Sequence, residues 1–124
     1  ANAILLPHVI EYNSQKPSKF VSFPKYETFI ADQRYAEIAR ELGMTFSSTA
    51  EGVKKLVAAI RDLMVRLNLP RSIAECKIEQ TAYFAAIPKL AEKAFEDQCT
   101  GTNPRMPLIR ELAAILEKIY QPVS

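Results

Sequence analysis

The sequence has few of the residues that bind metals or make tight turns. Its 124 residues include no Trp, three Gly, two Cys and one His. So few glycines, together with the absence of tryptophan, argue against a barrel or propeller built on many tight turns. A typical structural zinc site takes four nitrogen or sulfur ligands, and His8, Cys76 and Cys99 cannot supply four. Any metal site held by this chain alone would therefore be short of ligands.

The chain also lacks a strong charge and a long hydrophobic run. Sixteen Lys and Arg against fourteen Asp and Glu leave a net charge of +2, so we expect no nucleic-acid partner and no acidic membrane surface. The apolar run near the start, Ala3 to Leu6, is far too short to span a membrane, and no basic segment precedes it. Cys76 and Cys99 lie 23 positions apart in a chain large enough to fold without disulfides. This predicts reduced thiols in a cytoplasmic protein.

What the sequence does contain is helical periodicity, which predicts an all-α fold in a single domain. The clearest helix runs from about Ala50 to Leu67, where apolar residues recur at spacings of three and four. Ser48 and Glu51 have the capping-box spacing, in which each side chain bonds a free backbone N–H group at the start of the helix. The apolar stripe of this helix comprises Val53, Leu56, Val57, Ile60, Leu63, Met64 and Leu67.

Two shorter helices have recognisable ends. The segment from Arg34 to Leu42 is followed by Gly43, a natural left-handed C-cap. Near the C-terminus, the segment from Leu108 to Ile119 repeats the apolar pattern. Pro107 is expected at its first helical position, where the missing N–H group would be unpaired in any case.

Two further helical segments contain a proline. The segment from Glu79 to Cys99 is long enough for two helices, and Pro88 is expected to open the second. The segment from Ala1 to Tyr12 is expected to be a helix with a kink at Pro7. The residues expected to face inward after Pro88 are Leu90, Ala91, Ala94 and Phe95.

One polar surface loop is expected between the first two helices. It begins at Asn13, and its apolar points are expected to pack back onto the domain. Those points are Phe20, Val21, Phe23 and Pro24.

His8 invites a metal-ligand or general-base interpretation. Its nearest carboxylate along a helix is Glu11, and no second His exists in the chain. With so few potential ligands, we expect a partly buried His at a helix surface with a hydrogen-bond partner, and not a metal ligand.

The two cysteines lack the neighbours of a nucleophile. A reactive thiolate needs a base or a cation to lower its pKa, and no His lies in this half of the chain. We therefore expect Cys99 to be a packed or cleft-lining thiol and Cys76 to behave as a small hydrophobic residue.

The segment that follows Cys99 has two possible interpretations. If its N–H groups converged, Gly101, Asn103 and Arg105 would cradle an anion, with Arg105 fixing a carboxylate. As a structural turn, Asn103 would tolerate left-handed geometry, Pro104 would set φ, and Arg105 would bond nearby carbonyl groups. The residues alone favour the turn and leave both interpretations open.

Three motifs in register resemble the C-terminal half of the iron-dependent alcohol dehydrogenases. Within this family, the chain is most similar to the alcohol dehydrogenase part of the bifunctional aldehyde–alcohol dehydrogenases. That similarity lies in Phe23-Pro24-Lys25-Tyr26, in the insert before Arg34, and in Phe95 to Cys99 followed by Pro107-Leu108-Ile109. The three motifs are Ala1-Asn2-Ala3-Ile4-Leu5-Leu6-Pro7-His8-Val9, Arg34-Tyr35-Ala36-Glu37-Ile38-Ala39 and Cys99-Thr100-Gly101-Thr102-Asn103-Pro104-Arg105.

The resemblance implies a fold and a ligand set. The fold is dehydroquinate synthase-like, and residues 1–124 correspond to the C-terminal part of its helical, metal-side domain. An N-terminal α/β nucleotide-binding domain, absent from this chain, is the implied partner. Family members hold NAD and a divalent metal, usually iron, through one Asp and three His. Ala1 matches the final Ala of the His-Gly-x-Ala signature, which places the last ligand just upstream of Ala1 and leaves His8 outside the set.

The resemblance also implies a function. The chain would be a fragment of an NAD-linked, iron-dependent alcohol dehydrogenase that reduces acetaldehyde to ethanol, and it would form the helical wall of the interdomain cleft. Cys99 matches a position that borders the substrate entrance. The chain alone is expected to contain no catalytic, cofactor-binding or metal-binding residue, to bind neither Fe²⁺ nor NAD, to be inactive, and to self-associate.

The alternative is a free-standing, non-enzymatic helical module that binds a partner through an apolar groove. A natural module should begin with Met or a processing signal, whereas this chain opens with Ala1 in an apolar element. The opening therefore favours a fragment of something longer.

Overall fold

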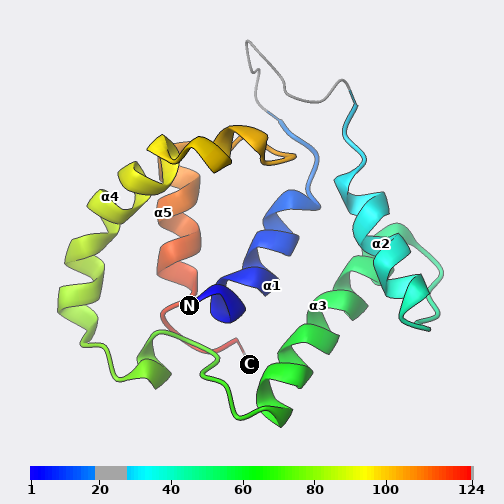
Figure 1. Ribbon diagram of the computed structural model, residues 1–124, viewed down its shortest axis with the longest axis horizontal. Coiled ribbons are helices and arrows are strands. Elements are labelled where there is room, and N and C mark those ends of the chain that lie inside the picture. The colour runs from blue at the N-terminus through cyan, green and yellow to red at the C-terminus, as the bar shows by residue number, and fades with distance from the viewer. Residues whose placement is uncertain (19–27, 124) are drawn as a thin grey trace.

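The computed structural model describes residues 1–18 and 28–123, and every regular element in these ranges is helical. The all-α prediction is therefore confirmed. The expected apolar points of the first loop, Phe20 to Pro24, lie outside the described residues. The elements are α1 (Asn2–Asn13), α2 (Ala31–Glu41), α3 (Thr49–Arg66), the 3₁₀ helix η1 (Ala74–Cys76), α4 (Gln80–Glu96), the 3₁₀ helix η2 (Gln98–Thr102) and α5 (Ile109–Lys118) (Figure 1).

Helix α3 begins almost where the sequence predicts, and half of the predicted capping box is present. Ser48 is the N-cap, and its hydroxyl accepts a hydrogen bond from the backbone N–H of Glu51 at 3.2 Å. The Glu51 carboxylate does not accept the second hydrogen bond of the box, which would come from the backbone N–H of Ser48. It accepts from the backbone N–H and the hydroxyl of Ser47, each at 2.8 Å. These hydrogen bonds stabilise the ionised form and lower the pKa of Glu51.

The end of α2 confirms the role predicted for Gly43. Its φ of 83° lies in the left-handed region, where glycine has no steric penalty. The N–H of Gly43 donates to the carbonyl of Arg40 at 2.9 Å, and the N–H of Met44 donates to that of Ala39 at 3.0 Å. This bond pair is a Schellman motif, which satisfies two carbonyl groups that the helix end would otherwise leave unpaired.

The prolines behave differently from the predictions. Pro88 lies inside one continuous helix, α4, and does not open a second one. The helix continues because its buried residues, Tyr83, Ile87 and Ala91, recur every four positions on both sides of Pro88. Pro107 is not the first helical residue of α5 either, because Leu108 precedes the helix as its N-cap. Pro7 lies within α1, as expected.

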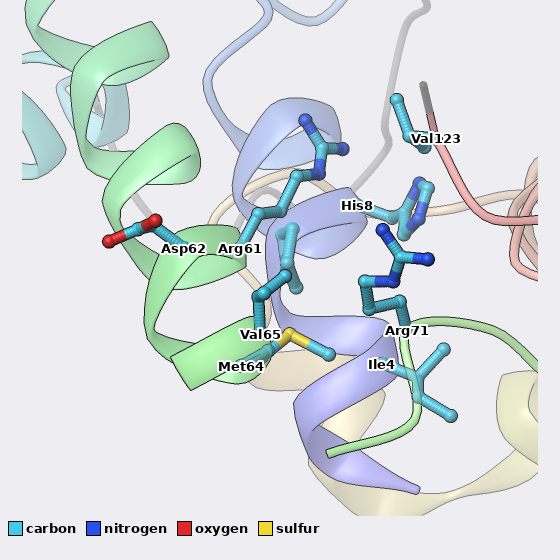
Figure 2. Close-up of a pocket in the computed structure, with 9 residues that line it drawn as sticks. Ile4, His8, Arg61, Asp62, Met64, Val65, Arg71 and Val123 are labelled. Atoms are coloured by element: carbon cyan, nitrogen blue, oxygen red, sulfur yellow. The ribbon is translucent and has the colours of Figure 1, made fainter. Parts of the chain in front are cut away.

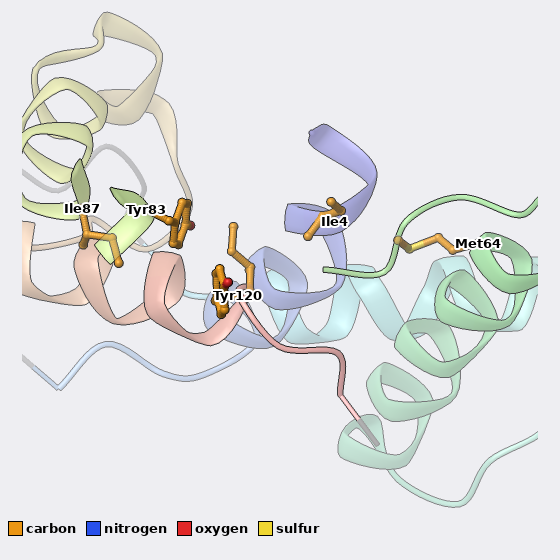
Figure 3. Close-up of a cluster of buried hydrophobic side chains, with 6 residues drawn as sticks. Ile4, Met64, Tyr83, Ile87 and Tyr120 are labelled. Carbon is orange, nitrogen blue, oxygen red and sulfur yellow. The ribbon is translucent and has the colours of Figure 1, made fainter. Parts of the chain in front are cut away.

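Helix α1 is shared by the two halves of the fold. In Figure 1, α2 and α3 lie on one side of α1, and α4 and α5 lie on the other. Ile10 of α1 belongs to a buried cluster with Ala39, Val53, Leu56 and Val57. Ile4, at the other end of α1, belongs to a second cluster with Met64, Tyr83, Ile87, Ile119 and Tyr120, drawn in Figure 3.

Helix α4 and the segment around η1 both bond to the end of α5 and the residues that follow it. The rings of Tyr83 and Tyr120 stack with centroids 5.5 Å apart, and the Tyr83 hydroxyl donates to the carbonyl of Leu116 at 2.8 Å. The N–H groups of Ile73 and Ala74 donate to the carbonyls of Ile119 and Tyr120 at 3.0 and 2.9 Å. These bonds fix the segment around η1 against the end of α5.

Several residues expected in the core are exposed. Leu63 and Leu67 of the α3 stripe are 51% and 59% exposed, and Leu90 and Phe95 of α4 are 40% and 36% exposed. The solvent-accessible surface is 8540 Å², whereas a compact domain of 13.9 kDa exposes about 6,700 Å². The periodicity correctly predicts helices, but these faces lack a cover within the described chain. No described helix has the length and apolar character needed to cross a membrane.

Gly52 provides a test of the contact between α3 and the segment before it. A Cβ atom at Gly52 would lie 2.8 Å from two ring carbons of Phe46. We expect Gly52→Ala to lower the free energy of unfolding by about 1 kcal/mol, because displacing the ring outweighs the gain in helix propensity. Chemical denaturation measures this change.

Gly101→Ala is the matched control, since a Cβ there meets nothing within 4 Å. It should change the stability little, and Phe46→Leu should relieve the defect of Gly52→Ala. A Gly52→Ala chain more stable than the parent would contradict the proposed steric conflict.

Candidate functional site

Cys99 lines a cavity of about 240 Å³ between α1, η2 and α5. Val9, Leu112 and Ile115 make part of its wall apolar, and Tyr12 and Asn103 place polar groups at its edge. The remaining lining residues are Asn13, Thr100 and Pro107. The cavity therefore combines an apolar surface with a few polar groups, as small-molecule pockets generally do.

Cys99 has the surroundings of a lining residue more than those of a nucleophile. It is exposed, and its backbone N–H donates to the Asp97 carboxylate at 2.8 Å. It lines the cavity together with Val9, Leu112 and Ile115. Cys76 is also exposed and is the last residue of η1.

A reciprocal pair of amides lines this cavity. The Nδ2 group of Asn13 donates to Oδ1 of Asn103 at 3.1 Å, and Nδ2 of Asn103 donates back to Oδ1 of Asn13 at 2.7 Å. Asn13 is only 3% exposed and also donates to the Tyr35 hydroxyl at 3.3 Å. The pair therefore ties the end of α1 to α2 and to the segment after η2.

Arg105 is the buried charge of this region. Its side chain is 9% exposed, and its Nη1 donates to the carbonyl of Tyr12 at 2.9 Å and to Oε1 of Gln15 at 3.2 Å. The guanidinium carbon lies 4.0 Å from the centre of the Tyr12 ring, a cation–π distance. Nη2 lies 3.5 Å from the Glu111 carboxylate. A charge this deeply buried needs such partners to offset its lost hydration.

Glu111 extends this network to the start of α5. It accepts from the Tyr12 hydroxyl at 2.8 Å and from the backbone N–H of Leu108 at 2.7 Å. Burial, followed by the hydrogen bond to Glu111, raises the pKa of Tyr12 well above its usual 10. Tyr12 therefore remains protonated and acts as a hydrogen-bond donor.

The geometry favours the structural turn over the anion cradle. The N–H groups of Cys99 and Thr100 donate to oxygen atoms of Asp97, and that of Asn103 donates to the carbonyl of Thr100, so none of the three is free for an anion. Arg105 bonds the carbonyl of Tyr12, as the turn interpretation predicts. Asn103 has an extended backbone with φ of −65°, so its tolerance of left-handed geometry is not used.

No pattern in the sequence indicated that Tyr12, Asn13 and Glu111 belong to this network. Asn13 pairs with a residue 90 positions away, and Tyr12 with one 99 positions away. The only available signal was the presence of polar residues at the end of an apolar helix. That signal does not specify a partner.

His8 is more buried than expected. It is 5% exposed, and its Nδ1 has no hydrogen-bond partner, which corrects the expectation that it has one. Nδ1 lies 4.0 Å from the Glu11 carboxylate, which also accepts from Arg61 at 3.1 Å. Burial is the main cause that lowers the pKa of His8 below 6.5, and Arg61 and Lys118 add to it against the effect of Glu11.

The described residues do not fit a metal centre. No group of three or more His, Cys, Asp or Glu side chains in residues 1–18 and 28–123 is placed to hold an ion. The one imidazole has a single nearby carboxylate, and a guanidinium already occupies that carboxylate. Too few free donors are present for a stable site.

The described residues form an all-helical fold with a cavity beside Cys99 and with uncovered apolar faces on α3 and α4. Residues 1–120 match the model of the Fe-containing alcohol dehydrogenase family, C-terminal. The chain belongs to this family, and the resemblance found in the sequence is confirmed.

Named relatives refine the family assignment. The bifunctional aldehyde-alcohol dehydrogenase AdhE of Escherichia coli K12 is 44% identical over 97% of this chain. Aldehyde-alcohol dehydrogenase 2 of Entamoeba histolytica is 40% identical over 98% of it. The NADPH-dependent butanol dehydrogenase of Clostridium saccharobutylicum is 29% identical over 97% of it. The chain spans 14% of the length of the first two relatives and 27% of the third.

Arg105 provides a test of the buried network. Arg105→Lys keeps the charge but loses the planar set of donors that reaches Tyr12, Gln15 and Glu111 together. We expect the free energy of unfolding to fall by about 1–3 kcal/mol. The matched control is Arg34→Lys, because Arg34 pairs with Glu37 at the surface and is 67% exposed. Equal losses of unfolding free energy in the two variants would show that the buried contacts of Arg105 contribute no more to stability than a surface ion pair does.

His8 predicts a pH dependence of stability. Since its pKa is lower in the folded chain than the usual 6.5, the unfolded chain binds the proton more readily. The contribution of His8 to the free energy of unfolding is therefore fully present above pH 6.5, and it is lost as the pH falls from 6.5 toward the lowered pKa of the folded chain. Denaturation at a series of pH values should show a smaller loss in His8→Gln over this window than in the parent. An identical dependence in both chains would refute the role of His8.

Proposed function

We propose that this chain is the C-terminal part of the helical, metal-side domain of an NAD-linked, iron-dependent alcohol dehydrogenase of the bifunctional type, which reduces acetaldehyde to ethanol. The observation that carries the proposal is the family match over residues 1–120. The names of the E. coli and E. histolytica relatives support the bifunctional type. The butanol dehydrogenase named as NADPH-dependent is less similar, which favours NAD over NADPH.

The residues of this chain would contribute a wall of the cleft between the two domains. The cavity beside Cys99 presents Val9, Leu112 and Ile115, which would exclude water from the alkyl part of an alcohol or aldehyde. The network around Arg105 would hold this wall in place. Iron and NAD would be held by other parts of the longer protein, including a His just upstream of Ala1, because the described residues do not fit a metal centre.

The uncovered apolar surface supports a missing partner domain. Leu63, Val65, Leu67 and Leu69 are 40–59% exposed around the end of α3. Leu63 and Leu67 are one helical turn apart and so lie on the same face, and a contiguous exposed apolar patch usually marks an interface. In the longer protein, an N-terminal nucleotide-binding domain would cover part of this surface. Without that domain, the chain would self-associate.

The thiols support a cytoplasmic setting. Cys76 and Cys99 are both free in the structure. Free, exposed thiols persist most readily in the reducing environment of the cytoplasm.

The proposal is tested by comparing the protein that carries this chain, purified from its source, with the 124-residue chain alone. The larger protein should contain iron and form reduced cofactor from NAD and ethanol under anaerobic conditions. The chain alone should show helical circular dichroism but no turnover above the no-protein control. Turnover by the chain alone would refute the proposal. A natural gene product of only 13.9 kDa would favour the non-enzymatic helical module instead.

Cys99 tests the cleft-wall role in the longer protein. A Phe side chain at position 99 would fill part of the cavity. We therefore expect Cys99→Phe to change the ratio of kcat/KM for butanol to that for ethanol by about tenfold, with the KM for NAD unchanged. Cys76→Phe is the matched control because Cys76 is an exposed thiol on η1. Unaltered selectivity in a folded Cys99→Phe enzyme would argue against this role.

A further inference from the structure

A second cavity, of about 250 Å³, lies between α1, the end of α3 and the segment that follows α3. Its base is formed by Ile4, Pro7 and Met64, all of which are buried. His8, Arg61 and Arg71 bring three basic side chains to it. The other lining residues are Asp62, Val65 and Val123.

The two guanidinium groups keep donors available for a ligand. Arg61 uses Nη2 to bond Glu11 at 3.1 Å, and Arg71 uses Nε and Nη2 to bond Glu75 at 3.2 and 2.8 Å. Within the described part of the chain, Nη1 of each donates no hydrogen bond. Figure 2 shows the Asp62 carboxylate turned away from His8 and Arg71, so it leaves the donors of the cavity free.

His8 adds a buried polar group that lacks a partner. Its Nδ1 is sealed from solvent and makes no hydrogen bond. Since Nδ1 is closed to solvent and His8 lines the cavity, we assign contact with a ligand to the other ring nitrogen, Nε2. A protonated ring would direct Nδ1–H toward Glu11, 4.0 Å away, and Nε2–H toward the ligand. An anion at Nε2 would stabilise the protonated ring, whose buried Nδ1–H then faces the Glu11 carboxylate.

We propose that this cavity binds a phosphate group, either free or at the end of a small phosphate ester, through Nη1 of Arg61, Nη1 of Arg71 and Nε2–H of His8. Planar guanidinium donors match the spacing of phosphate oxygens, and charge-assisted hydrogen bonds are the strongest that proteins form. The apolar base lowers the local dielectric constant and so strengthens these bonds. The cavity is larger than one phosphate group, so the organic part of an ester would lie on Ile4, Pro7 and Met64.

This site is independent of the proposed dehydrogenase function and of the cavity beside Cys99. Its charged surroundings are Glu11 on α1, Arg61 and Asp62 on α3, Arg71 and Glu75 after α3, and Lys118 on α5. The cations disfavour a protonated His8 in the empty cavity. A bound dianion would reverse that preference and raise the pKa of His8.

The experiment uses the full chain and the imidazole NMR signals of His8, which are unambiguous because the chain has one His. Inorganic phosphate and glycerol 3-phosphate are titrated separately at constant ionic strength against chloride. We expect a saturable shift of the His8 signals and a rise of its pKa by about one unit at saturation. Tighter saturation by glycerol 3-phosphate would identify an ester as the occupant, and equal or tighter saturation by inorganic phosphate would identify the free ion.

Three variants decide whether the guanidinium groups are responsible. Arg61→Gln and Arg71→Gln should each weaken the apparent affinity about tenfold or more, since each removes a charge-assisted hydrogen bond. Arg34→Gln should leave it unchanged, because Arg34 is paired with Glu37 on α2, outside this cavity. Circular dichroism checks the fold of each variant. Any one of three results would overturn the proposal. The shift of the His8 signals does not saturate, it persists in both cavity variants, or it is lost in Arg34→Gln as well.

Discussion

The fold depends on placing the charge of Arg105 inside the protein. A buried guanidinium without partners would cost several kcal/mol, roughly the whole stability of a small domain. Its partners are the carbonyl of Tyr12, the side chain of Gln15 and the carboxylate of Glu111. These groups satisfy the charge only when α1, the segment after η2 and the start of α5 are in position together. One side chain thus links the end of the first helix to the last, and the Asn13–Asn103 pair reinforces the same junction.

The sequence predicted what is locally determined. Helix α3 was located within about one residue, because its apolar stripe and Ser48 act over a few positions. Gly43 was correctly placed because a left-handed C-cap is also a local device. The cleft-lining role of Cys99 rested on resemblance, and the cavity beside it is compatible with that role.

Other features depend on contacts that a local pattern does not contain. Pro88 was expected to start a helix, but packing of Tyr83, Ile87 and Ala91 in phase keeps α4 continuous. Leu63 and Leu67 repeat at core spacing yet remain exposed, because periodicity reports an apolar face without saying what covers it. The partners of Arg105 and Asn13 lie about 90 residues away, beyond the reach of any helical or capping rule.

The position of α1 between the two clusters has a consequence for how the chain folds. Helix α1 is synthesised before the other described helices, yet Ile4 packs with Ile119 and Tyr120, and Tyr12 bonds Arg105 and Glu111. Contacts between residues so distant in sequence form slowly, because a long loop must close before they contribute. During translation, α1 must therefore wait until residues near position 120 have left the ribosome. Until then Ile10 can already pack with Ala39, Val53 and Leu56, whereas Ile4, at the other end of α1, stays without Ile119 and Tyr120 and is exposed to non-native contacts.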